Sequence, residues 1–196
     1  MSSVYHEQQT GSSTHCALHS ANNLLGRPEF TLQHFLTLKK QLAIDDELGL
    51  CSCCLHSLPP CCCHRCRQDE GNFDANILTV ALAQHNIELS WWDARNKDEK
   101  AVLGALQSEN CLGVLINQQA GFDNGCVVSC LLKVLSLCFG KNGHWVALRK
   151  IDNQHFVDLN SSRNLQTVYG SKDVLTFLAQ HLNNGSHLLL AHRRTE

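Results

Sequence analysis

The chain has 196 residues, of which 43% are hydrophobic and 17% charged, and its formal net charge is −2. These proportions are typical of a folded globular protein and argue against a disordered chain. A near-neutral charge gives no electrostatic reason to expect nucleic acid or an anionic membrane surface as a partner. The length suits one domain, and we expect a single domain over residues 1–196 in a monomeric protein.

The twelve cysteines bear on the compartment in which the protein works. The first fifteen residues are polar and contain no apolar stretch of the kind that a secretory signal has. Many cysteines without such a signal favour free thiols in the cytosol or the nucleus. The most apolar stretch, residues 126–139, contains Lys133 and is shorter than the about 20 apolar residues that a spanning helix needs. We therefore expect a buried element there and no membrane span.

Two helices are predicted in the first part of the chain. Apolar residues recur at helical spacing over residues 16–25, where a Ser or Thr at 12–14 is expected to cap the start and Gly26 to end the helix. A second helix is predicted over 31–43 with Thr31 as its cap.

Residues 51–66, CSCCLHSLPPCCCHRC, form a cysteine-rich, low-complexity segment that we interpret as an insert in the domain. The cysteines at 51 and 54 and those at 63 and 66 have the C-x₂-C spacing of structural zinc sites. Zinc is one reading of this segment. Reversible acylation, a redox-sensitive loop and a loop without function are the alternatives.

The rest of the chain predicts helices and strands that alternate at first and strands that cluster later. Helical patterns are found at 72–86, 98–109 and 171–182, and strand patterns at 87–93, 111–117, 144–151, 155–160 and 187–191. Early helices and late strands favour an α+β fold in which helices pack on an antiparallel sheet.

Cys16 stands at the predicted first turn of a helix, where unpaired backbone N–H groups favour negative charge. Such a position is suited to a nucleophilic thiolate. A cysteine on an apolar helix is also a common packing residue, because a free thiol behaves as a small hydrophobic group. A catalytic reading therefore needs a base and a group that orients the base.

His144 and Asn160 are the candidates for that base and that orienting group. His144 opens the first strand of the late hairpin and Asn160 ends the second. A three-residue turn at 152–154 places them on the same face as diagonal neighbours, about 7–8 Å apart at their backbones. A two-residue turn places them on opposite faces, so the turn length decides whether the two side chains meet.

Six segments of the chain occur in the order typical of the Josephin family of cysteine-type deubiquitinases: VYHEQQ (4–9), CALHSANNLL (16–25), GNFDANILTVAL (71–82), WWD (91–93), HWVALRK (144–150) and DLNS (158–161). The chain resembles this family, especially its short members that consist of a Josephin domain alone. The resemblance covers nearly the whole chain apart from 44–70 and 120–142. It implies a papain-like fold, hydrolysis after the C-terminal glycine of ubiquitin, and ubiquitin and its conjugates as partners.

The resemblance also implies a set of site residues. The family's Cys-Ala-x-His pattern places the nucleophile on Cys16, its His-Trp-Val pattern places the base on His144, and its Asn-Leu-Asn/Asp pattern places the orienting residue on Asn160. Its His-Glu-x-Gln pattern places an oxyanion-stabilising glutamine on Gln9. Trp145 is a candidate for lining the cleft that admits the ubiquitin tail, with a core position as the alternative. No cofactor is expected for this chemistry.

The chain departs from the family pattern between Gln9 and Cys16. Six residues separate them, where the family usually has four, and Gln8 is therefore a rival for the oxyanion role. This departure motivates a second hypothesis, a catalytically weak module that binds ubiquitin. A third hypothesis is a zinc-binding interaction protein built around residues 51–66.

Overall fold

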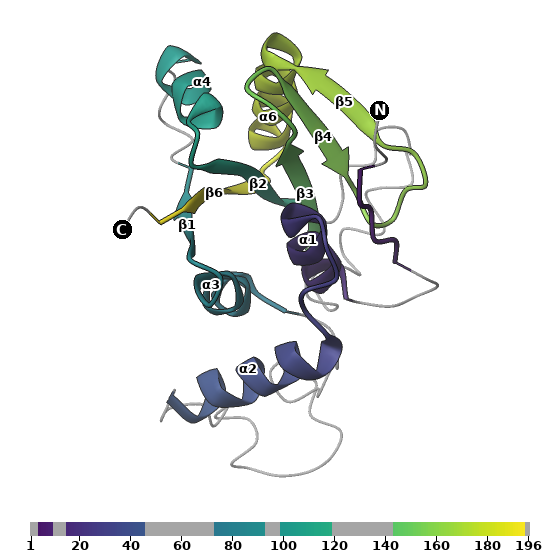
Figure 1. Cartoon of the computed structure of the whole chain (residues 1–196), viewed down its shortest axis with the longest axis vertical. Coiled ribbons are helices and arrows are strands. Elements are labelled where there is room, and N and C mark those ends of the chain that lie inside the picture. Colours follow the sequence, from purple (N-terminus) through teal and green to yellow (C-terminus); the bar gives the residue numbers. More distant parts are fainter. Residues whose placement is uncertain (1–3, 10–14, 46–72, 93–98, 119–142, 195–196) are drawn as a thin grey trace, which may run out of the picture.

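The computed structural model describes residues 4–9, 15–45, 73–92, 99–118 and 143–194 (Figure 1). The described part is an α+β fold in which helices pack on a six-stranded antiparallel sheet, as the sequence predicts. The helices are α1 (Cys16–Leu25), α2 (Leu32–Asp45), α3 (Ala75–Ala83), α4 (Glu99–Gln107) and α6 (Ser171–Asn183). The strands are β1 (Ile87–Trp91), β2 (Cys111–Gln118), β3 (His144–Lys150), β4 (His155–Leu159), β5 (Thr167–Gly170) and β6 (His187–Arg193). Their order in the sheet is β1-β6-β2-β3-β4-β5.

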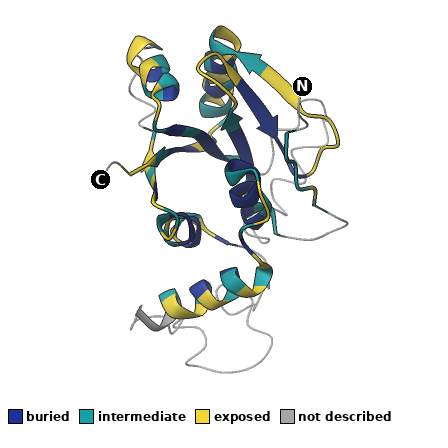
Figure 2. Cartoon of the chain, in the orientation of Figure 1, coloured by how far each residue is buried: buried dark blue, intermediate teal, exposed yellow. Residues whose placement is uncertain are grey.

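The sheet is covered on both faces. The helices α1, α2 and α3 share one hydrophobic cluster with sheet residues such as Leu115, Ala147 and Leu159. The helices α4 and α6 form the other cluster with the alternate sheet residues, among them Ile116 and Leu148. Because successive side chains of a strand point to opposite faces, both sets of residues are buried in the central strands β2 and β3 (Figure 2). This burial explains why those strands read as continuous apolar runs.

The start of α1 differs from the prediction. The residue at its N-cap is His15, which makes no side-chain capping hydrogen bond, so the predicted Ser or Thr cap at 12–14 is wrong. The backbone N–H groups of the first turn are consequently left to other partners. The predicted end is confirmed: Gly26 is the C-cap with φ 72°, and its N–H donates to the Asn22 carbonyl at 2.8 Å.

Two other elements differ from the prediction. The helix α3 is shorter than the predicted 72–86, because the Asp74 carboxylate caps it by accepting from the N–H groups of Asn76 and Ile77. After its end, Asn86 takes φ 59° and turns the chain into β1. The strand β5 was not predicted. It is an edge strand whose four residues are exposed or half-buried, and it therefore lacks an alternating hydrophobic pattern.

The β3–β4 hairpin has the register that a three-residue turn produces. Lys150 lies opposite Phe156 and Ala147 lies opposite Leu159. The turn is stabilised by Asp152, whose Oδ1 accepts hydrogen bonds from the N–H groups of Gln154 and His155 at 2.7 and 2.8 Å. The predicted condition for bringing His144 and Asn160 onto one face is therefore confirmed.

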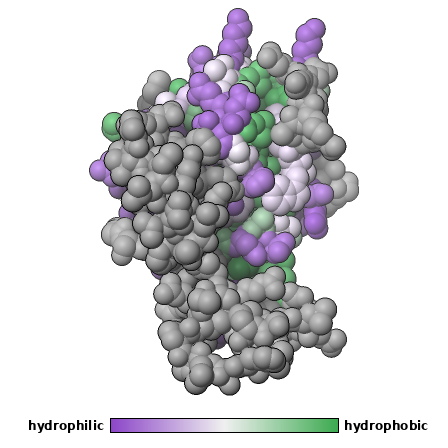
Figure 3. Space-filling view, turned by 180° about the vertical axis from the view of Figure 1, so that it is seen from behind, coloured by the Kyte–Doolittle hydropathy of each residue, from purple (hydrophilic) through white to green (hydrophobic). Residues whose placement is uncertain are grey.

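Some predicted features lie outside the described residues. They are the cysteine-rich segment 51–66 and the apolar stretch 126–139. The single domain with an insert consequently stays a prediction. Among the described helices, none has the length and apolarity needed to cross a bilayer. On the face opposite to that of Figure 1, the described surface mixes hydrophobic and hydrophilic residues (Figure 3).

Candidate active site

The structure brings His144 and Asn160 together. Nε2 of His144 lies 2.9 Å from Oδ1 of Asn160, in hydrogen-bonding geometry. His144 begins β3, and Asn160 directly follows the last residue of β4. The side chain of Asn160 is almost completely buried, with 3% of its surface exposed. A buried amide that is held in this way keeps the imidazole ring in one orientation.

Two further hydrogen bonds settle which end of the Asn160 amide faces the histidine. Its Oδ1 also accepts from the backbone N–H of Ser162 at 3.0 Å and from the Ser162 hydroxyl at 2.7 Å. A backbone N–H can only donate, so the atom that faces it is the oxygen. His144 must therefore donate through Nε2–H, and in the neutral ring Nδ1 is left as the basic nitrogen.

Cys16 lies at the first position of α1 and contacts the start of β3. The backbone N–H of Trp145 donates to its Sγ at 3.4 Å, and Trp145 is the residue that follows His144. Burial raises the pKa of the Cys16 thiol above its ordinary value, although N–H groups of Trp145, Ala17 and Cys16 itself work in the opposite direction. The helix N-terminus thus does not by itself lower the pKa of this thiol, and a catalytic role needs the base that the sequence analysis asks for.

The N-terminal segment 4–9 runs beside the end of β4. The N–H of Gln9 donates to the Ser161 carbonyl at 2.8 Å, and Nε2 of His6 lies 3.1 Å from the carbonyl oxygen of Asn160. Gln9 is half-buried, whereas Gln8 is exposed. The backbone of Gln9 is thus held against Ser161, the residue that directly follows Asn160.

Two asparagines of α1 fasten this segment to the helix. Nδ2 of the fully buried Asn23 donates to the carbonyls of Glu7 and Leu159 at 3.1 and 3.2 Å, and its Oδ1 accepts from the N–H of Glu7. Asn22 donates to the Glu7 carboxylate at 2.8 Å. Helix, N-terminal segment and strand β4 are therefore joined through one buried polar network.

Trp145 lies in the core. Only 3% of its surface is exposed, and its indole N–H donates to the Phe73 carbonyl at 3.1 Å. This position agrees with the core alternative that the sequence left open and leaves the ring no surface with which to line a cleft. The contribution of Trp145 to the site is its backbone N–H at Cys16.

Comparison with known proteins identifies the relatives of this chain. The family model described as Josephin matches residues 11–192. The chain belongs to the Josephin family. Josephin-2 of Mus musculus is 31% identical over 184 residues, which make up 93% of this chain and 82% of the mouse protein. Josephin-2 of Homo sapiens is 30% identical over 93% of this chain and 81% of its own length. A Josephin-like protein of Drosophila melanogaster is 27% identical over 95% of this chain and 72% of its own length.

Membership in the Josephin family establishes two general properties. The fold is the papain-like cysteine protease fold, which agrees with the α+β architecture described above. The family is one of cysteine-type hydrolases that act as deubiquitinases. In this Josephin domain, the three residues predicted to form a triad all lie at the same end of β3 and β4.

Sequence reasoning missed several residues of this Josephin site. Glu7, Asn22 and Asn23 carried no predicted role, although a pair of asparagines inside an apolar helix is a signal of buried polar contacts. Burial would raise the pKa of the Glu7 carboxyl, but hydrogen bonds from His19 and Asn22 and the nearby charge of His19 outweigh it and lower that pKa. Glu7 is therefore held ionised.

A further missed residue is Asp158 of β4, which precedes Asn160 by two positions. It is 6% exposed, and its Oδ1 has no hydrogen-bond partner among the described residues. Burial raises the pKa of this carboxyl, against the opposing effects of Arg163, the Asn160 N–H, His6 and His144. The site thus has an acidic group whose charge the fold solvates poorly.

The described residues contain no group of three or more His, Cys, Asp or Glu side chains arranged to hold a metal ion. The zinc reading concerns residues 51–66, which lie outside them, and stays a prediction.

Proposed function

We propose that this protein is a deubiquitinase that hydrolyses the bond after the C-terminal glycine of ubiquitin with Cys16, His144 and Asn160. The observation that carries the proposal is the hydrogen-bonding distance of 2.9 Å between His144 Nε2 and Asn160 Oδ1. Cys16 lies beside this pair, because its Sγ accepts from the backbone N–H of Trp145, the residue after His144, at 3.4 Å. This arrangement supplies a nucleophile, a base with one free nitrogen and a group that fixes the base.

In the proposed reaction, His144 Nδ1 takes the proton of the Cys16 thiol while Sγ attacks the carbonyl carbon of the ubiquitin glycine. The tetrahedral intermediate collapses when the protonated His144 gives its proton to the leaving lysine amine. A water molecule, deprotonated by the same nitrogen, then hydrolyses the thioester. Because burial raises the pKa of Cys16, proton transfer has to accompany the attack, and the role of His144 is that of a general base.

The oxyanion of the intermediate needs hydrogen-bond donors, and we assign them to the Gln9 side chain and the Cys16 backbone N–H. Support comes from the backbone of Gln9, which is held against Ser161, and from Cys16, which begins a helix without a side-chain cap. Loss of one such donor typically lowers the rate by about 10²–10³.

A second candidate function is a ubiquitin-binding module with weak catalysis. Two observations favour it: the raised pKa of the Cys16 thiol and the six residues that separate Gln9 from Cys16. Such a protein would bind ubiquitin without turning over its conjugates.

Hydrolysis of a fluorogenic C-terminal amide of ubiquitin separates the two candidates. The deubiquitinase proposal expects turnover by the wild-type chain, none by Cys16→Ala, and unchanged turnover by Cys111→Ala. Cys111 is the matched control, since it is the other free cysteine among the described residues, is buried, and begins β2, whose opposite end pairs with His144. Calorimetric titration with ubiquitin is run in parallel, and binding by a folded, reduced wild-type chain that shows no turnover would establish the module instead.

A further inference from the structure

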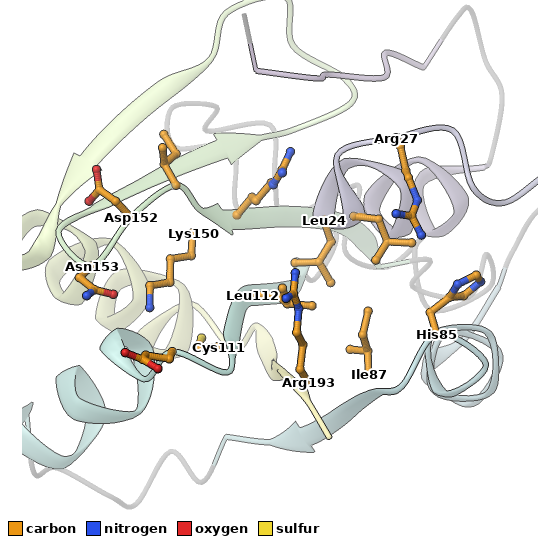
Figure 4. Close-up of a pocket in the computed structure, with 14 residues that line it drawn as sticks. Leu24, Arg27, His85, Ile87, Cys111, Leu112, Lys150, Asp152, Asn153 and Arg193 are labelled. Atoms are coloured by element: carbon orange, nitrogen blue, oxygen red, sulfur yellow. The ribbon is translucent and has the colours of Figure 1, made fainter. Parts of the chain in front are cut away.

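A cavity lies at the C-terminal end of α1, away from Cys16 at the other end of the helix. It has a volume of about 560 Å³ and is bordered by the ends of α1, β3 and β6 and by the β3–β4 turn (Figure 4). Its lining includes four cationic side chains, Arg27, Arg149, Lys150 and Arg193. Cavities of a few hundred Å³ with convergent polar groups are the usual size of small-ligand sites.

The cavity exists because helix α1 stops before it covers this end of the sheet. The helix ends at Gly26. In the sheet, Gly113 of β2 lies between Arg149 of β3 and Ala191 of β6. Gly113 has φ 146° and a Cβ there would collide with the Leu148 carbonyl, so this buried position between the strands requires glycine. Arg193 follows Ala191 by two positions and therefore projects on the same face as Arg149.

The guanidinium of Arg149 is half-buried and lies against the backbone of Gly26, where a Cβ would overlap it. The C-terminal end of α1 attracts a cation and accounts for this position. The helix end offers backbone carbonyl groups and no carboxylate, however. Within the described residues Arg149 makes no ion pair. Burial lowers the pKa of this guanidinium, which shows that its charge is incompletely solvated.

The other charged groups of the cavity are mostly engaged elsewhere. Arg27 pairs with Glu29, and Lys150 Nζ donates to the carbonyls of Gln107 and Ser108 at 2.9 and 2.8 Å. Asp152 is held in its own turn by His155.

Among the charged lining residues, Arg149, Lys150, Arg193 and Glu109 have no ion-pair partner in the described part of the chain. Because cations outnumber carboxylates among these side chains, the part of the cavity without ion pairs carries a net positive charge.

The floor of the cavity is apolar. Leu24 of α1, Ile87 of β1 and Leu112 of β2 line it, and Figure 4 shows them between Lys150 on one side and His85 on the other. Leu24 and Ile87 are almost completely buried, so the half-buried Leu112 supplies the apolar surface that a ligand can reach. An arginine fork suits the paired oxygens of a phosphate or a carboxylate. We propose that this cavity binds a small soluble anion in which a phosphate or carboxylate head is attached to an apolar body. The head lies between Arg149 and Arg193, and the body covers Leu112.

Phenyl phosphate is the probe, titrated by calorimetry into the full chain at constant ionic strength. Saturable binding is expected below about 10 mM, the weak end of specific association. Arg149→Gln and Arg193→Gln each weaken it by about tenfold, because each removes a charge-assisted hydrogen bond. Arg194→Gln is the matched control. It removes the same charge from the next residue, which is exposed and faces Glu88, and it changes the affinity by less than about twofold.

Inorganic phosphate and benzoate serve as the two further probes. An affinity for inorganic phosphate below that for phenyl phosphate supports the role of the apolar floor. The ratio of the affinities for benzoate and phenyl phosphate shows whether a carboxylate or a phosphate head is preferred. The absence of saturable binding of both aromatic anions would overturn the proposal, as would an equal loss in the Arg194 variant. Arg193 is exposed, so Arg193→Gln keeps the test valid even where the Arg149 variant does not fold. Neither arginine belongs to the proposed catalytic residues, and ubiquitin hydrolysis without the probe should be unchanged in both variants.

Discussion

The two ends of α1 serve opposite kinds of group. At the N-terminal end, a first turn without a side-chain cap meets the thiol of Cys16, and the nearby His144 is paired with the buried Asn160. At the C-terminal end, Gly26 closes the helix against the guanidinium of Arg149, and cations face an open cavity. The sign of the helix dipole matches both arrangements.

The comparison shows that the dipole alone does not set the chemistry at either end. Burial raises the pKa of Cys16 in spite of the helix N-terminus, because desolvation is the larger effect. In the proposed mechanism the thiol therefore depends on His144 as its base, and the buried amide of Asn160 holds the His144 ring. At the C-terminal end, Arg27 pairs with Glu29 and Lys150 donates to two backbone carbonyls. Arg149 and Arg193 have no ion-pair partner among the described residues and remain available to a ligand.

The largest expected effect comes from removing the base at the N-terminal end. His144→Gln should lower kcat/KM for ubiquitin amide hydrolysis by about 10²–10⁴, the usual contribution of a general base. His155→Gln, at the exposed start of β4, should leave kcat/KM unchanged. Steady-state kinetics on the two variants measures both, and an equal loss in the two would contradict the assignment of the base.

The network that connects α1, Glu7 and β4 can be broken at Asn23. Asn23→Ala leaves the N–H and the carbonyl of Glu7 and the carbonyl of Leu159 without this partner. Unfolding in urea should show a loss of about 1–3 kcal/mol, as for other buried groups that lose their hydrogen bonds. The control is Asn153→Ala in the exposed β3–β4 turn, which should change the free energy of unfolding by less than about 0.5 kcal/mol.

At the C-terminal end, Gly26→Ala should cost about 1 kcal/mol in the free energy of unfolding, because a residue with a Cβ is strained at φ 72°. The added Cβ should also displace the Arg149 guanidinium, and the variant should lose phenyl phosphate affinity while it keeps ubiquitin hydrolysis. Retained affinity in the folded variant would show that the position of Arg149 over Gly26 does not matter for the anion.

The smallest effect is a pH dependence at Asp158. Its pKa is raised in the folded state, so its contribution to stability is present below the unfolded pKa and is lost as the pH rises through the folded pKa. In Asp158→Asn the side chain carries no charge at any pH, so the variant does not lose stability at this position as the pH rises. The free energy of unfolding of the variant relative to the wild type should therefore increase from about pH 4 to pH 7. A difference that stays constant or decreases over this range would contradict the assignment.

Much of this fold follows from patterns that the sequence displays openly. Helical spacing and Gly26 gave the bounds of α1, and the polar turn at 152–154 gave the register of the hairpin. That register in turn places His144 and Asn160 together, so the central contact of the site was predictable. The strand β5 was not, because an exposed edge strand lacks the alternation on which a strand prediction rests.

The parts of the site that escaped prediction depend on contacts distant in the sequence. The N-terminal segment lies against β4 through Asn23, Ser161 and Asn160, which no local pattern reveals. The pKa of Cys16 likewise depends on how deeply β3 and α1 bury it, and helix position alone pointed the other way. The cavity at Arg149 lies where α1 ends at Gly26 and brings together residues from α1, β1, β2, β3 and β6, which only the packed structure shows.

The most direct test of the account is the labelling of the reduced chain by ubiquitin that carries a C-terminal electrophile, with the modified residue mapped by mass spectrometry. The account predicts one adduct, on Cys16, that is absent from Cys16→Ala, unchanged in Cys111→Ala and formed much more slowly by His144→Gln. A folded, reduced wild-type chain that forms no adduct, or forms it on another cysteine, would contradict the proposed active site.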